Sequence, residues 1–305
     1  MMKLSIKKLT LTALTSTFLL VGCSKTDINK ALDIVDNLTT QTEESSSGEF
    51  VSANNSGETV TPDNFSIELS DTTLNGADVV NLPALADGEF YYVVNDNVPN
   101  FTDEQLIDTT NWEDYKELDE LGRQTGAEAN ISAEMMPADD EDRESISGIK
   151  PSGWNQNSRG DAISDVVNGG WLYERSHLIG HQLVGNIKDD LNQRNSYIVN
   201  NDFDTVSELK ERALMTGTEW LNADGGNGMI AIENYVADYL ENNDTNHIHY
   251  RVTPIFNEDE SLARGVQMEG FSIEDNGKVQ FNVYIPNIQP NVAIDYQTGA
   301  SEVAK

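Results

Sequence analysis

Histidine is the side chain best suited to exchange protons near neutral pH, and this chain has few of them. The four are His177, His181, His247 and His249. His177 comes just after a predicted strand, and Arg175 stands two residues before it. An arginine at that spacing is a natural phosphate contact beside a general base. The spacing alone also fits a histidine that is only hydrogen-bonded within the scaffold, which is the commoner case.

Other kinds of catalytic site lack their motifs. The chain has no G-x-S-x-G, Walker A, C-x-x-C or complete H-E-x-x-H sequence, so serine hydrolase, P-loop and zincin chemistry have no support. His181 follows His177 by four residues, a zinc-pair spacing, but no carboxylate base accompanies it. His247 and His249 alternate on a predicted strand and share one face. A zinc enzyme built on these histidines is one alternative.

The only cysteine, Cys23, marks the end of an export signal. Lys3, Lys7 and Lys8 precede the apolar run at residues 9–21, which is shorter than the roughly 20 residues of a spanning helix. The run therefore predicts a signal peptide at residues 1–22. Its end, Leu20-Val21-Gly22-Cys23, resembles the lipobox of bacterial lipoproteins. We expect Cys23 to be lipidated and to hold the protein at the extracellular face of the cell membrane.

A polar tether and one domain are expected to follow. Residues 23–81 are rich in Ser, Thr, Asn, Asp and Glu, the composition of a flexible linker. Residues 82–305 suit one large domain. The formal net charge of the whole chain is −33. Taken alone, this charge argues against a nucleic-acid partner, because phosphate binding needs basic residues, although a local basic groove would suffice.

The remaining patterns place these residues on secondary structure. We expect strands at residues 89–94 and 171–173, a helix opening at Thr102, and an amphipathic helix at 227–240. Further strands are predicted at residues 247–256, 263–273 and 278–285, with an Asp275-Asn276-Gly277 hairpin turn. The predicted class is α+β, with a mixed, largely antiparallel central sheet and a few helices.

Several sequence blocks, in order, resemble one known family. They are residues 117–123 (ELDELGR), 150–154 (KPSGW), 174–185 (ERSHLIGHQLVG), 216–222 (TGTEWLN), 250–256 (YRVTPIF) and 281–299 (FNVYIPNIQPNVAIDYQTG). The chain is similar over this span to the DNA/RNA non-specific endonucleases, in the branch of DNA-entry and secreted nucleases of Gram-positive bacteria. Shared order over such a length is more specific than any one motif.

The resemblance implies a ββα-metal, or His-Me, finger. In that arrangement His177 would be the general base that activates water, and Asn222 would be the one protein ligand of a hydrated Mg²⁺, with Mn²⁺ as an alternative ion. Arg175 would face phosphate, and the substrate would be DNA or RNA, with no obligate protein partner. A hard cation suits an amide oxygen and several waters. Without the neighbouring Thr-Gly-Thr block, Asn222 would be interpreted as a turn residue.

The sequence departs from the family pattern at three places. Glu174 stands where Asp or Asn is usual, and residues 188–210 resemble an inserted acidic loop. Relatives commonly carry a second Asn nine positions before the metal ligand, where this chain has Ala213. Asn195 or Asn201 could replace it. These departures leave open a second alternative, an inactive nuclease-like lipoprotein that binds DNA or a protein partner.

Overall fold

The computed structural model describes residues 74–85, 88–138, 143–154, 163, 165–167, 170–187, 197–200 and 202–304. Cys23 and the expected signal peptide lie outside these residues, as do Asn195 and Asn201. The packed part of the chain extends before Leu82, where we expected the domain to begin. Leu74 and Val79 are buried in a cluster with Tyr92 and Tyr284, because α2 (Gly76–Val79) lies against the end of the main sheet.

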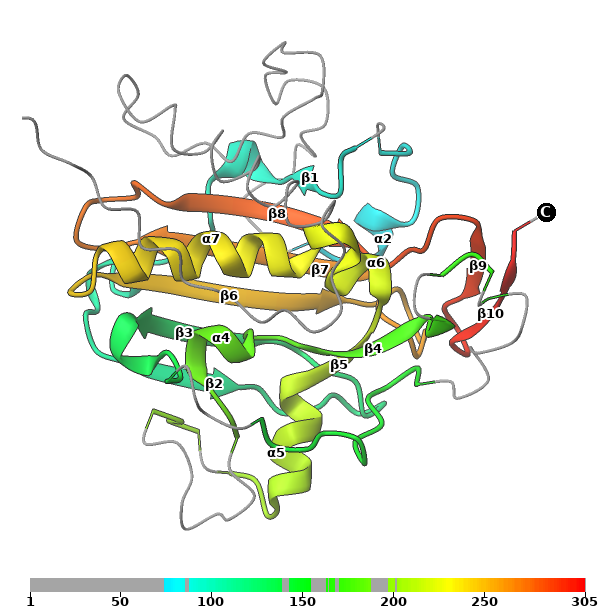
Figure 1. Ribbon diagram of the computed structural model, residues 1–305, viewed down its shortest axis with the longest axis horizontal. Helices are drawn as coiled ribbons and strands as arrows, with labels where there is room; N and C mark the ends of the chain where they lie inside the picture. The colour runs from blue at the N-terminus through cyan, green and yellow to red at the C-terminus, as the bar shows by residue number, and fades with distance from the viewer. Residues whose placement is uncertain are drawn as a thin grey trace, which may run out of the picture.

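The described residues form an α+β fold around a six-stranded antiparallel sheet, as the sequence predicted (Figure 1). The strand order is β1-β8-β7-β6-β3-β2. The strands are β1 (Tyr92–Val93), β2 (Trp112–Tyr115), β3 (Ala127–Ser132), β6 (His247–Ile255), β7 (Gly265–Ser272) and β8 (Gln280–Pro286). Two antiparallel strand pairs form separately, β4 (Tyr173–His177) with β5 (Leu214–Thr218) and β9 (Val292–Asp295) with β10 (Ala300–Val303).

The helices of the described residues are short apart from α7. They are α2, α4 (His181–Val184), α5 (Val206–Ala213), α6 (Glu219–Asn222) and α7 (Met229–Asn242), with single 3₁₀ turns at η2 (Asn95–Asn97), η3 (Gln105–Ile107), η4 (Ala133–Met135) and η7 (Asp224–Gly226). The helix expected from Thr102 is only the η3 turn. The segment expected to be an inserted loop includes most of α5, whose first turn is capped by the Thr205 hydroxyl.

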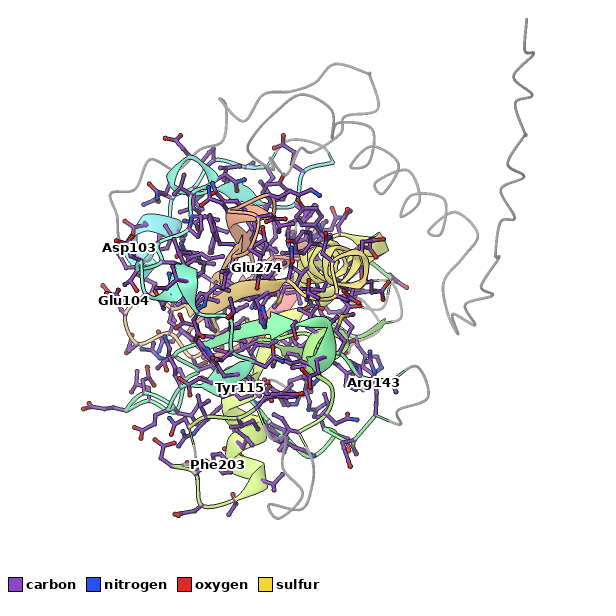
Figure 2. All side chains as sticks on the ribbon, turned by 90° about the vertical axis from the view of Figure 1, so that its left-hand side faces the viewer. Asp103, Glu104, Tyr115, Arg143, Phe203 and Glu274 are labelled. Carbon is purple, nitrogen blue, oxygen red and sulfur yellow. The ribbon has the colours of Figure 1, made fainter. Side chains whose placement is uncertain are left out.

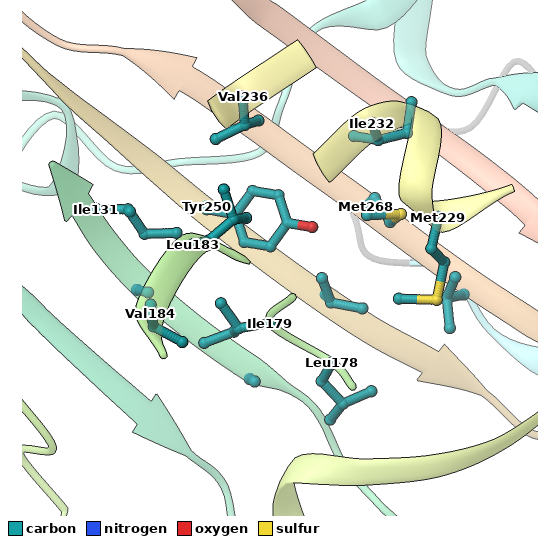
Figure 3. Close-up of a cluster of buried hydrophobic side chains, with 14 of the residues drawn as sticks. Ile131, Leu178, Ile179, Leu183, Val184, Met229, Ile232, Val236, Tyr250 and Met268 are labelled. Carbon is teal, nitrogen blue, oxygen red and sulfur yellow. The ribbon is translucent and has the colours of Figure 1, made fainter. Parts of the chain in front are cut away.

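The core lies between one face of the sheet and α7, which runs along that face, roughly parallel to β6 (Figure 1). Alternate residues of β6 point into it, including Ile248, Tyr250 and Val252, because strand side chains alternate between faces. Ile232 and Val236 meet them from α7 (Figure 3). Burying each such side chain contributes about 1.5–3 kcal/mol. The helical spacing of apolar residues in α7 and the strand pattern of β6 are the sequence features that predicted these two elements.

The predicted hairpin turn between β7 and β8 is confirmed. Asn276 and Gly277 have φ values of 58° and 84°, the left-handed conformation that asparagine and glycine tolerate best. The turn sets the register in which Phe271 faces Gln280. The three C-terminal strands of the sheet thus lie side by side as the sequence predicted.

The opposite face of the sheet is polar yet buried. His249 is fully buried, and its Nε2 lies 2.8 Å from the Glu128 carboxylate. Arg251 donates to Glu269 at 2.8 Å, and Phe101 packs edge-on against His249. His247 pairs with Glu274 at 2.6 Å. The two histidines therefore share a face, as expected, but β6 is a central strand and each histidine is tied to a carboxylate.

Candidate active site

The antiparallel pair of β4 and β5, called the β4–β5 hairpin below although α4 and α5 lie in its connection, forms with α6 the ββα unit that carries the expected motif residues. His177 pairs with Leu214 across the hairpin, and Glu174 with Gly217. Gly217 allows close packing here, because a Cβ there would lie 2.3 Å from the Ser176 hydroxyl and 2.9 Å from the Leu221 side chain, and both would have to shift. Thr218 then caps α6 by accepting the Leu221 N–H at 3.0 Å. The Thr-Gly-Thr block thus fixes α6 against the hairpin.

His177 is the last residue of β4, and not a loop residue after a strand as we expected. Burial, together with the nearby charges of His181 and Arg143, lowers the pKa of His177 to about 4. The imidazole is therefore neutral at neutral pH and can accept a proton. Among the described residues, none is hydrogen-bonded to its side chain. The ring is thus chemically available as a base.

A cavity of about 200 Å³ adjoins His177. It lies between the end of β4, α4, the last turn of α5 and the segment at residues 143–146. Arg143, an exposed side chain in this segment, lines the cavity and is close enough to His177 to lower its pKa. Figure 2 shows Arg143 at the edge of the molecule. Sequence reasoning missed Arg143, because it lies in an acidic stretch without a recognisable motif.

Arg175 shares a strand face with His177, but its guanidinium group is largely engaged. Its Nε donates to the Ile149 carbonyl at 2.5 Å and its Nη2 to the Ser147 carbonyl at 2.9 Å. The group also lies 4.0 Å from the ring centroid of Trp154. Arg175 therefore holds the 147–154 segment against β4. A phosphate contact by its remaining Nη1 stays a prediction.

Asn222 is the last residue of α6 and is half-buried. The helix packs against β4, β5 and α7, and Gly228 sits against the Leu221 carbonyl, where a Cβ would come within 2.3 Å. These contacts fix where α6 ends. The Asn222 carboxamide makes no hydrogen bond to another described residue, so its oxygen is available to a ligand. The structure gives no direct contact between Asn222 and His177.

Glu233, on α7, is a buried carboxylate that sequence reasoning missed. Burial raises its pKa to about 7, against the opposing charge of Arg143. Its Oε2 lies 2.5 Å from where a Cβ on Gly180 would be, so Gly180 makes room for the carboxylate three residues after His177. Its position in the sequence could have identified it, because Glu233 stands on the buried face of α7, beside Ile232 and Val236.

The other candidate residues are arranged as follows. His181 opens α4 and lines the cavity, near enough to His177 to lower its pKa. Ala213 is buried and lines the same cavity. Burial raises the pKa of Glu174 above its usual value. Asn186 also lines the cavity and accepts the Glu144 N–H at 2.9 Å, which places an amide there even though Ala213 lacks one.

The donor set fits a hydrated hard cation better than a zinc cage. Within the described ranges, no three His, Cys, Asp or Glu side chains gather where they could hold a metal. A zinc site that combines His177 with His249 is also not supported, because His249 is buried against Glu128 on the other face of the main sheet. Asn222 offers a neutral amide oxygen, and Mg²⁺ characteristically keeps most of its ligands as water.

This part of the fold thus contains a neutral imidazole at the end of a strand, a carboxamide at the end of a helix and a cavity with an arginine at its rim. A family model for DNA/RNA non-specific endonucleases matches residues 104–201 and 207–273, more than half of the chain. The chain therefore belongs to the DNA/RNA non-specific endonuclease family, and it is a nuclease by class.

Two solved structures of one nuclease, with and without bound metal, support this fold. The crystal structure of NucA from Streptococcus agalactiae with magnesium bound aligns with a TM-score of 0.54 at 22% identity, covering 70% of this chain and 87% of that one. The same protein without metal aligns at 0.53 over the same shares and at the same identity. Sda1 nuclease with bound zinc aligns at 0.45 and 26% identity, covering 63% of this chain and 81% of that one.

In the part of the chain that the structure describes, no helix has the length and apolar character needed to cross a membrane.

Proposed function

We propose that this protein is a metal-dependent endonuclease that cuts DNA or RNA with little sequence preference, with His177 as its general base. The observation that carries the proposal is the state of His177. Its pKa of about 4 leaves the imidazole neutral, and the ring lies beside a cavity with Arg143 at its rim. A neutral base next to a cation suits attack by water on an anionic ester.

The other side chains would divide the remaining work. Asn222 would hold the metal, which supplies polarisation of the phosphate and stabilises charge on the leaving oxygen. Arg143 would bind a non-bridging phosphate oxygen, a role for which its guanidinium geometry is well suited. Arg175 would position the 147–154 segment and contact phosphate through Nη1. Mg²⁺ is the proposed ion, and Mn²⁺ the alternative.

Glu233 would balance the charge of the metal. A buried carboxylate with a pKa raised to about 7 is costly to ionise on its own. A divalent cation nearby would favour its ionised form, so metal binding should release protons near neutral pH. NucA of S. agalactiae was crystallised with magnesium, which supports the choice of ion without fixing it for this chain.

The N-terminal sequence supports a lipid anchor. We propose that Cys23 carries a diacylglycerol and that residues 24–73 tether the nuclease domain outside the cell membrane. Two acyl chains are enough for stable membrane binding, whereas one is marginal. The domain would then cut nucleic acid at the surface of its own cell.

Plasmid cleavage by the full-length protein tests the proposed activity. We expect supercoiled plasmid to be nicked and linearised in Mg²⁺, and to survive in EDTA. His177→Ala should lower the rate by at least about a hundredfold, the usual contribution of a general base. Cleavage that persists undiminished in His177→Ala would contradict the proposal.

A second candidate function is a non-catalytic nuclease-like lipoprotein that binds DNA or a protein. Ala213 favours it, because an alanine offers no donor or acceptor beside His177, and so does the net charge of −33. Tight DNA binding without nicking at any divalent metal concentration would favour this candidate over the first. Efficient nicking would exclude it.

A further inference from the structure

Residues 287–289, which follow β8, connect the main sheet to the ββα unit. The Asn287 N–H donates to the Arg264 carbonyl at 2.7 Å, which continues the pairing of β8 with β7 by one residue. The Asn287 side chain, which is fully buried, bonds to β5 instead. Its oxygen accepts the Thr218 N–H at 2.8 Å, and its nitrogen donates to the Thr216 carbonyl at 3.0 Å. Asn287 therefore joins the two sheets.

The first turn of α6 is bound by the same segment. The first four N–H groups of a helix have no partner within it. In α6 the first of them, on the N-cap Thr218, is bound by Asn287. The third, on Trp220, donates to the Gln289 side-chain oxygen at 3.1 Å. The other two donate to the Leu172 carbonyl and the Thr218 hydroxyl. Two side chains of one segment thus satisfy two of the four groups.

The backbone of this segment is itself held in place. The Thr218 hydroxyl donates to the Ile288 carbonyl at 2.6 Å, and the Tyr296 hydroxyl donates to the Asn287 carbonyl at 2.9 Å. The segment is thus bonded on one side to the start of α6 and on the other to the turn after β9. All of its residues belong to the 281–299 sequence block, which supplies none of the proposed catalytic residues.

Asn222 lies less than one turn beyond these contacts. α6 has only four residues, and so short a helix is not stable without contacts from outside. Within the described part of the chain, the Gln289 side chain is hydrogen-bonded to Trp220 alone. Asn287 also bonds to β5, the strand that pairs with the His177 strand. Gln289 therefore acts on α6 and not directly on the strands.

We propose that Asn287 and Gln289 are positioning residues for the metal ion, because they bind the first turn of α6 and thereby fix the Asn222 carboxamide. The inference rests on the proposed function, in which Asn222 is the metal ligand. Groups that orient a metal ligand commonly contribute about 10- to 100-fold to metal affinity or activity. The 281–299 block then has a role at the site although it contributes no catalytic residue.

Metal binding by the full-length protein tests this role separately from cleavage. Mn²⁺ is titrated into each protein, and free Mn²⁺ is measured by electron paramagnetic resonance. The Asn222→Ala protein reports the Mn²⁺ that binds elsewhere on the acidic surface. Gln289→Met removes the oxygen that accepts the Trp220 N–H, and its Mn²⁺ dissociation constant should rise about tenfold. Gln289→Glu keeps an acceptor oxygen at this position and should bind Mn²⁺ at least as tightly as the wild type.

Gln267→Met is the matched control. Gln267 is also buried, and its side-chain oxygen also accepts a backbone N–H, that of Leu74 at 2.9 Å, but on the polar face of the main sheet. Its Mn²⁺ affinity should equal that of the wild type even if its melting temperature falls. In plasmid nicking, Gln289→Met should need about tenfold more Mg²⁺ for half-maximal rate, while the KM for plasmid stays unchanged.

Wild-type Mn²⁺ affinity in Gln289→Met would overturn the proposal, and so would an equal loss of affinity in Gln267→Met. If Gln289→Met fails to fold, Gln289→Asn withdraws the same oxygen by one methylene, and unchanged affinity in that variant overturns the proposal. Binding that Asn222→Ala leaves undiminished overturns it as well. A wild-type protein that binds Mn²⁺ through Asn222 but never nicks plasmid would refute the proposed activity, and the Gln289 variants would still decide the positioning role.

Discussion

At the scale of single residues, the site is governed by burial. His177 is held neutral and Glu233 is held near its protonation midpoint, since burial lowers the pKa of a base and raises that of an acid. Arg143 adds to the first effect and opposes the second. One exposed arginine thus acts on two titrating groups that lie on different elements, β4 and α7.

The raised pKa of Glu233 predicts a pH-dependent stability. Because the folded-state pKa of about 7 exceeds the ordinary value of 4.5, the folded protein binds more protons than the unfolded chain between these values, and its stability falls as pH rises through that window. Glu233→Gln removes this effect. In EDTA, its unfolding free energy relative to wild type should increase between pH 4.5 and pH 8 by up to about 3 kcal/mol.

Denaturant unfolding of both proteins at the two pH values measures this difference. Titration of His177 affects both proteins alike and cancels. If the difference in unfolding free energy between the two proteins stays constant with pH, ionised Glu233 does not destabilise the folded protein. The proposal that Glu233 balances the charge of a metal ion would then lose its support.

The residue scale also marks where sequence reasoning stopped. His177 and Asn222 were recognisable because each belongs to a motif with local spacing. Arg143 was not, because its approach to His177 depends on how the 143–146 segment packs around the end of β4. Glu233 was accessible in principle, as a carboxylate on the apolar face of a predicted helix.

At the scale of elements, the helix of the ββα unit is held in place by its contacts with neighbouring residues, because the helix itself is short. α6 spans only Glu219–Asn222, too short to be stable on its own. Its position depends on the Thr218 cap and on the contact of Leu221 with Gly217. Asn222 follows Leu221 directly, so any shift of α6 moves the proposed metal ligand.

Gly217→Ala should therefore impair both stability and activity. The added methyl group would overlap the Ser176 hydroxyl and the Leu221 side chain, which we expect to cost about 1–3 kcal/mol of unfolding free energy. Plasmid nicking should fall at least about tenfold, because a small misplacement of a catalytic group is costly. Gly148→Ala is the matched control, since a Cβ there would meet no atom within 4 Å. Equal nicking by the two variants would contradict this account of α6.

The elements also differ in how far they could be predicted. α7 and the β6, β7 and β8 strands were expected within a few residues, because strong periodicity and an Asn-Gly turn define them locally. The strand that carries His177 was placed too early, at 171–173 rather than Tyr173–His177. The extent of β4 is set by its pairing with β5. Because β5 comes much later in the chain, the sequence around β4 does not indicate where the strand ends.

At the scale of the whole molecule, the protein and a nucleic-acid substrate are both negatively charged, and basic side chains gather at the cavity beside His177. The chain carries −33 overall, which repels a polyanion at long range. The cavity beside His177 concentrates arginine, lysine and histidine side chains in one place. A tether that keeps the domain at a membrane would raise the local encounter rate with nucleic acid held at the cell surface.

Cys23→Ser tests the proposed anchor. The wild-type protein should fractionate with membranes and have the mass of the chain from Cys23 onward plus one diacylglyceryl group, whereas Cys23→Ser should lose both properties. Nuclease activity per molecule should be the same in the two proteins, because Cys23 is no part of the proposed active site. Recovery of unmodified wild-type protein in the medium would contradict the proposal.

Chemical rescue of the general base tests the central claim most directly. His177→Gly leaves space beside an existing cavity, which free imidazole can enter. We predict that this variant fails to nick plasmid in Mg²⁺ and regains activity as imidazole is added, in proportion to the neutral form of the added base, while the wild-type rate is unaffected. Full activity of His177→Gly without imidazole would contradict the account.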